Sequence, residues 1–176
     1  MPLLRITYQR GALTKAQKAQ LAADVTPVLL IGEVGRDSAQ GRAATYVLFH
    51  ELDPATEWFV GGEPDSSAPK GGRFLFEIWY LDGAATQSEK SHVHAQMNDI
   101  IARTFDVDGT FPNRLGDWVI INEVPEGAWG ASGVTVGIAA ANEALGGAPE
   151  RSEYFDRFLS ARQRASDAHG FPVERA

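Results

Sequence analysis

Pro2 is the leading candidate for a catalytic residue in this chain, because removal of Met1 turns it into an amino-terminal secondary amine. No other coded residue supplies such an amine. Removal of methionine before a small residue is expected, and an α-amino group has a pKa of about 7.7 to 8.0. Burial beside apolar surface, or a nearby cation, lowers this pKa further. We therefore expect Pro2 to act as a base or a nucleophile near neutral pH, although many chains simply begin with Met-Pro.

Two side chains near residue 81 are candidates to assist Pro2. If the strand predicted over 74–81 runs antiparallel beside the first strand, its end lies next to the amine and brings Tyr80 and Asp82 close. Asp82 would favour the protonated amine and raise its pKa. Tyr80 would donate a hydrogen bond to a developing enolate oxygen. The alternative for Tyr80 is a core residue that matches Tyr8.

Three further residues are candidates for substrate binding. Arg73 can bind a carboxylate, and its alternative is a solvated linker arginine. His50 can carry protons, and its alternative is a structural or exposed histidine at a strand end. Trp129 lines a pocket or caps the core. The chain has no cysteine, which excludes a thiolate nucleophile and a cysteine zinc site. We predict no metal site and no cofactor.

The elements that would position these residues form an internal repeat. Segment 4–14 matches segment 76–86 without a gap, sharing Ile, Tyr, Gly, Ala and Thr about 72 residues apart. Segment 47–52 falls on segment 119–124 at the same offset. Two copies are too few for a stacked array, so the repeat indicates a pseudo-symmetric duplication. We predict a single domain over residues 1–176.

Each half is predicted to be a strand, a helix and a strand. Segments 3–9 and 74–81 are short, rich in aromatic and aliphatic residues, and followed by a turn containing Gly. Each helix then begins with a capping box, Thr14 to Gln17 in the first half and Thr86 to Glu89 in the second.

The two predicted helices differ in regularity. The second helix has an apolar stripe at helical spacing, and its members are Val93, Met97, Ile100 and Ile101. Leu21 and Val25 begin a stripe on the first helix, but Pro27 lacks an amide hydrogen and crowds the preceding turn. We expect the first helix to kink or end near Val25 or Thr26.

The predicted fold is α/β of the α+β type. Two tandem β-α-β units, over 2–62 and 73–130, form a four-stranded mixed sheet in a pseudo-twofold arrangement, with two helices on one face. Arg5 and Glu77 occupy matching positions and would face each other across the central strands. Residues 131–176 form a carboxy-terminal extension with a short helix and a final amphipathic helix, which caps a subunit or crosses to a neighbour.

Charge and hydropathy exclude several classes of partner. The net charge of -7 and the pI near 5.1 argue against binding to nucleic acid, because phosphate backbones are bound by concentrated Lys and Arg. No apolar run approaches the ~18 residues of a membrane span, and no secretory leader opens the chain. We expect a cytoplasmic protein without a membrane partner.

The duplicated unit that starts at Pro2 resembles the tautomerase superfamily. Within it the chain is similar to the two-unit group of cis-3-chloroacrylic acid dehalogenase. The segments that carry this second resemblance are 49–54, 59–62, Trp118-Val119, Glu123 to Pro125 and 154–156. The resemblance implies a homotrimer of two-unit subunits, a cofactor-free active site around Pro2, and keto-enol or Michael-type chemistry on small carbonyl acids.

Leu81 and Ala84 stand where the dehalogenase group has two arginines that bind the substrate carboxylate. We therefore predict a tautomerase-like enzyme in which Pro2 is the general acid/base for keto-enol tautomerisation of a small carbonyl or unsaturated acid. The alternatives are a Pro2-dependent hydratase, dehalogenase or decarboxylase with other auxiliary residues, and a non-catalytic oligomer that keeps the fold. An unrelated duplicated ferredoxin-like monooxygenase domain is the alternative fold.

Overall fold

The fold is taken from a computed structural model, which describes residues 2–169. The elements in chain order are β1 Leu3–Gln9, α1 Lys15–Val34, α2 Ala39–Ala43, β2 Tyr46–Leu52, β3 Phe59–Val60, β4 Glu63–Pro64, β5 Phe74–Leu81, α3 Gln87–Phe105, β6 Trp118–Val124, β7 Gly130–Ala131, β8 Val134–Thr135, α4 Ile138–Ala144 and α5 Pro149–His169.

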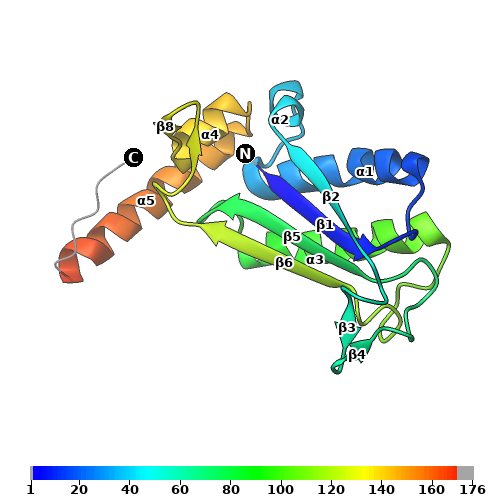
Figure 1. Cartoon of the computed structure of the whole chain (residues 1–176). Helices are drawn as coiled ribbons and strands as arrows, with labels where there is room; N and C mark the ends of the chain where they lie inside the picture. The colour runs from blue at the N-terminus through cyan, green and yellow to red at the C-terminus, as the bar shows by residue number, and fades with distance from the viewer. Residues whose placement is uncertain (1, 170–176) are drawn as a thin grey trace.

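Four strands form the main sheet in the order β2-β1-β5-β6 (Figure 1). The outer pairs β1–β2 and β5–β6 are parallel, and the central pair β1–β5 is antiparallel, which gives the predicted pseudo-twofold arrangement. Arg5 lies opposite Glu77 in the register, and their charged groups are 3.6 Å apart. The predicted mixed sheet of two β-α-β units is confirmed.

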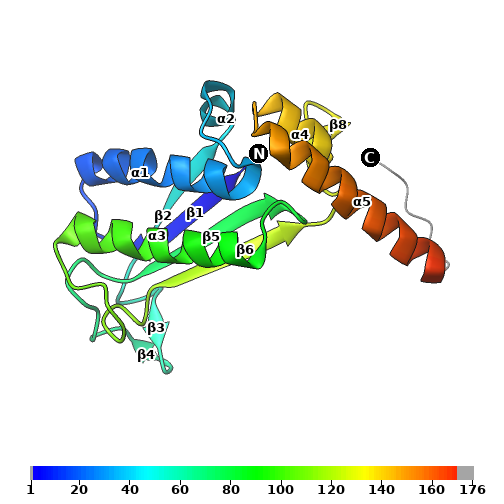
Figure 2. The same ribbon diagram turned by 180° about the vertical axis from the view of Figure 1, so that it is seen from behind.

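Helices α1 and α3 cover one face of the sheet (Figure 2). Side chains alternate along a strand, so every second residue of the central strands points toward the helices. These positions are fully or almost fully buried, and they are Leu4, Ile6, Tyr8, Phe76, Ile78 and Tyr80. The predicted stripe of α3 is buried as well, at Val93, Met97, Ile100 and Ile101.

Both capping boxes are present. The Thr14 hydroxyl accepts a hydrogen bond from the amide of Gln17, and the Gln17 side chain accepts one from the amide of Thr14. Thr86 and Glu89 make the same reciprocal pair at the start of α3. Each box satisfies donors that a helix leaves free at its first turn.

The predicted end of the first helix near Pro27 is wrong, because α1 continues to Val34. Proline inside a helix costs about 3 kcal/mol through a lost hydrogen bond and a steric clash. The turns beyond Pro27 bury Leu29, Leu30 and Val34, and each such side chain contributes about 1.5 to 3 kcal/mol. Burial of the last turns therefore outweighs the cost of the proline.

No described helix covers the other face of the sheet (Figure 1). Four large apolar side chains on the edge strands of this face are exposed: Tyr46 and Leu48 on β2, and Trp118 and Ile120 on β6. An apolar face of this extent is typical of a surface that another molecule covers. We call these four residues the open face.

The carboxy-terminal extension packs beside the turn between β5 and α3. The predicted short helix is α4, and the predicted final helix is α5, which buries Phe155. Arg151 of α5 donates to the carbonyl of Ala84 at 3.1 Å and pairs with Glu89. Among residues 2–169 we find no helix with the length and apolarity of a membrane span.

Candidate active site around Pro2

Pro2 is buried directly before β1. Its carbonyl accepts a hydrogen bond from the amide of Tyr46 at 3.2 Å, which ties the start of the chain to β2. The antiparallel register pairs Leu3 with Trp79, so Pro2 lies opposite Tyr80, one position further along β5. The sheet therefore fixes Pro2 beside the end of β5, as the sequence predicts.

Tyr80 points to the helix-covered side of the sheet and is 0% exposed. Its hydroxyl has no hydrogen-bond partner among the described residues. Burial raises the pKa of this phenol far above its usual value, and the charges of Glu33 and Glu89 raise it further. Tyr80 is therefore a neutral hydroxyl with a hydrogen bond to give.

Glu33, in the last turn of α1, is a site residue that sequence reasoning missed. It is only 1% exposed, and the amide of Leu81 donates a hydrogen bond to its Oε1 at 3.3 Å. Burial raises the pKa of the Glu33 carboxyl, while the amino-terminal charge and the Leu81 amide act in the opposite direction. A titratable carboxyl group thus lies between the end of α1 and the end of β5.

The helical spacing of α1 contains the signal for Glu33. Leu21, Val25, Leu29 and Glu33 follow one another at intervals of four residues, and all four are buried. A carboxyl group on the buried stripe of an amphipathic helix is costly and therefore indicates a functional position. The expected break at Pro27 hid this continuation of the stripe.

Asp82 and Trp129 lie at the same end of the sheet as Pro2. Asp82 follows β5 and pairs with Arg162 of α5, so its charge is compensated from the extension. Trp129 follows β6, whose last residue Val124 accepts a hydrogen bond from the amide of Asp82 at 2.9 Å. The partly buried indole of Trp129 packs against the main core.

Arg73 and His50 lie elsewhere. Arg73 precedes β5 at the opposite end of that strand, seven residues and about 23 Å from Tyr80. Exposed His50 lies beside Thr7 in the register of β1 and β2, about 17 Å along the strand from Pro2. One subunit does not bring either side chain to Pro2.

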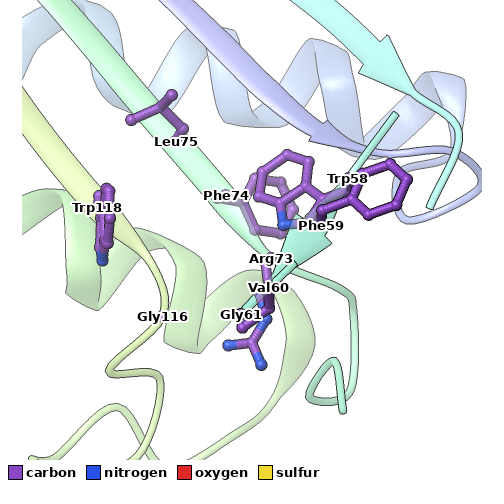
Figure 3. A pocket seen from close by; sticks show the side chains of 9 residues that line it. All are labelled: Trp58, Phe59, Val60, Gly61, Arg73, Phe74, Leu75, Gly116 and Trp118. Atoms are coloured by element: carbon purple, nitrogen blue, oxygen red, sulfur yellow. The ribbon is translucent and has the colours of Figure 1, made fainter. Parts of the chain in front are cut away.

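Arg73 instead lines a separate pocket of about 510 Å³ (Figure 3). Apolar and aromatic side chains form most of its wall, including Trp58, Phe59, Phe74 and Trp118. The Nε of Arg73 donates to Asp65 at 2.6 Å, so its charge is already paired.

Glu33 and Tyr80 bring a carboxyl group and a phenol to the end of β5 beside Pro2. A carboxyl group whose pKa is raised can exchange a proton, and a neutral phenol can hold an oxygen on which charge develops. The described residues around Pro2 thus include groups that can take part in acid–base chemistry.

Solved structures share this fold. Native fused 4-OT aligns with a TM-score of 0.60 and 23% identity, covering 82% of this chain and 98% of that chain. N1, a member of the cis-3-chloroacrylic acid dehalogenase family, aligns with a TM-score of 0.61 and 18% identity, covering 88% and 99%. Pt0534, solved after inactivation by 2-oxo-3-pentynoate, aligns with a TM-score of 0.59 and 16% identity, covering 79% and 98%.

Other fused 4-OT structures are described as symmetric or asymmetric trimers. No family model matches the chain, and no curated protein matches it. The fold predicted from the repeat is confirmed by these structures. The chain has the fold of the tautomerase superfamily, with a resemblance to the group of cis-3-chloroacrylic acid dehalogenase.

Proposed function

We propose that this chain is a cofactor-independent tautomerase in which the amine of Pro2 is the general acid/base. The observation that supports this most directly is the burial of Pro2 opposite Tyr80, in a fold shared with fused 4-OT. The substrate is a small enolisable carbonyl compound. Pro2 takes a proton from the carbon next to the carbonyl and returns it to another position, while Tyr80 donates a hydrogen bond to the carbonyl oxygen.

The reaction begins with the free amine. The amine binds the proton released from the substrate carbon, and the electrons of the broken C–H bond form the C=C bond of the enolate. The neutral Tyr80 hydroxyl stabilises the developing oxyanion and keeps its own proton, because burial raises its pKa. Asp82 would add negative charge near the amine, reduced by its pairing with Arg162.

The test is the enzymatic keto-enol equilibration of phenylpyruvate and of its methyl ester, followed by the ultraviolet absorbance of the enol. We expect turnover of at least one of the two compounds. Pro2→Ala should lower kcat/KM by about 10²- to 10⁴-fold, because a positioned general base contributes that much. Loss of turnover in Pro2→Ala with an unchanged circular dichroism spectrum supports the proposal, and unchanged turnover would contradict it.

We further propose that the active form is a homotrimer assembled through the open face. Tyr46 and Trp118 are each 63% exposed on this face, and fused 4-OT proteins of the same fold form trimers. A charge at Ile120 would have to be buried in such an interface, which is costly. Ile120→Lys should therefore give monomers in analytical ultracentrifugation. Ile31→Lys, a matched change on the helix side where Ile31 is also exposed, should leave the trimer intact.

A further inference from the structure

The carboxyl group of Glu33 has no assigned role in the proposed reaction, although it is the buried acid at this end of the sheet. Its carboxyl accepts from the Leu81 amide, and Leu81 is the neighbour of Tyr80, which faces Pro2. Gly32 places the backbone of α1 against the Tyr80 ring, since a Cβ there would lie 2.7 Å from the Tyr80 hydroxyl. The last turn of α1 is thus packed directly onto the site.

The other charged groups around this turn come from several elements. The charge of Glu89, on α3, raises the pKa of Tyr80, and Glu89 pairs with Arg151 of α5. Arg151 packs against Gly35 at the end of α1. Arg36 follows α1 and is exposed.

Two further ion pairs lie at this end of the sheet, and each has no net charge. Asp82 pairs with Arg162, and Lys90 pairs with Glu123 at 2.7 Å. The cations that α3 and α5 bring to this end are therefore compensated by surface or half-buried carboxylates. Glu33 differs from these carboxylates in being buried, and its contact with the Leu81 amide holds it at the end of β5 beside Pro2.

We propose that Glu33 is the proton partner of Pro2, and that it makes the site select carbonyl substrates without a carboxylate group. This inference rests on the proposed function of Pro2. The pair holds one proton and has no net charge, either as amine and carboxylic acid or as ammonium and carboxylate. A substrate carboxylate therefore finds no net positive charge at Pro2.

The proton balance of the reaction uses both forms of the pair. The free Pro2 amine takes the α-proton, the C–H electron pair forms the C=C bond, and the Glu33 carboxylic acid gives its proton to the carbonyl oxygen. The products are the enol and the ammonium–carboxylate pair. Transfer of the proton from Pro2 to Glu33 restores the starting form, so the site needs no further reactant.

The first arm of the test compares kcat/KM for phenylpyruvate methyl ester and for phenylpyruvate, which differ in the carboxylate charge. The wild-type protein should prefer the ester. At a pH below the apparent pKa of Pro2 in the variant, Glu33→Gln leaves the charge of protonated Pro2 unbalanced, so the ratio of acid to ester should rise about tenfold or more. Glu123→Gln, a surface carboxylate near the same end, should leave the ratio unchanged.

The second arm needs no turnover and follows the pH dependence of Pro2 alkylation by 2-oxo-3-pentynoate, measured by mass spectrometry. Glu33→Gln should lower the apparent pKa of alkylation by about one to three units, since a neighbouring carboxylate stabilises the ammonium form. Glu33→Asp keeps the charge and should stay close to the wild-type profile. Circular dichroism establishes that each variant is folded.

The outcomes separate this proposal from the function on which it rests. A Pro2 that is never alkylated overturns both. An alkylated Pro2 whose pH profile and acid-to-ester ratio are the same in wild type and Glu33→Gln overturns the role of Glu33 alone. If Glu33→Gln does not fold, a wild-type preference for the acid over the ester overturns it as well.

Discussion

Tyr80 and Tyr8 occupy equivalent positions of the repeat, and replacing each with phenylalanine should change stability in opposite directions. Both rings are 0% exposed. The Tyr8 hydroxyl donates to Oε2 of Glu51 at 3.3 Å, whereas the Tyr80 hydroxyl has no partner among residues 2–169. The Tyr8 hydroxyl therefore contributes a hydrogen bond to the folded state. The Tyr80 hydroxyl loses its hydration on folding and gains no hydrogen bond among the described residues.

The expected magnitudes follow from these environments. An unsatisfied buried hydroxyl costs about 1 to 3 kcal/mol, so Tyr80→Phe should raise the free energy of unfolding by about 1 kcal/mol after the loss of packing around the oxygen. Tyr8→Phe loses a hydrogen bond worth about 1 kcal/mol and should lower the free energy of unfolding by that amount. For a chain of this length each kcal/mol corresponds to about 2 to 4 °C in Tm.

The assay is thermal and urea unfolding of the three proteins, combined with turnover of phenylpyruvate and of its methyl ester. Tyr80→Phe should lose about 10²- to 10³-fold in kcat, the usual effect of removing one oxyanion donor, while becoming more stable. Tyr8→Phe should keep its activity. A Tyr80→Phe variant destabilised by 1 kcal/mol or more would refute the reasoning, because its hydroxyl would then have to hold a partner in the folded protein.

Two further predictions concern the last turn of α1. Gly32→Ala should lower the free energy of unfolding by about 1 to 3 kcal/mol. The added Cβ would lie 2.7 Å from the Tyr80 hydroxyl and 2.9 Å from Cγ2 of Val93. A Tm within 1 °C of wild type would contradict this prediction. Glu33→Gln should raise the Tm at pH 7 and not at pH 4. The Glu33 carboxyl has its ordinary pKa of 4.5 in the unfolded chain and a raised pKa in the folded chain. The stability of the wild-type protein therefore falls as the pH rises through the interval between these two pKa values. A gain in Tm that is equal at both pH values would contradict the raised pKa.

The sequence predicts the sheet well because the repeat constrains it twice. Matching strands at one offset, each followed by the same capping box, specify two β-α-β units, and the pairing of Arg5 with Glu77 follows from their symmetry. The approach of Tyr80 to Pro2 follows from the same antiparallel register.

The sequence predicts less where packing outweighs local preference. A proline predicts a break, but α1 passes Pro27 because three large side chains are buried beyond it, and this continuation carries Glu33 to the site. Proximity along the chain also misleads, since Arg73 and Tyr80 belong to one strand region and lie at opposite ends of it. The four-residue spacing from Leu21 to Glu33 is visible in the sequence, but the burial that outweighs the cost of Pro27 appears only in the fold.

The measurement that most directly tests the central claim is mass mapping of the amino-terminal peptide after exposure of the purified protein to 2-oxo-3-pentynoate, with Pro2→Ala as control. The account predicts that Met1 is absent and that one equivalent of the reagent is bound at the Pro2 nitrogen, with slower modification of Pro2→Ala. An unmodified Pro2, or a Pro2 still preceded by Met1, would contradict the proline mechanism and leave a binding or structural role for this fold.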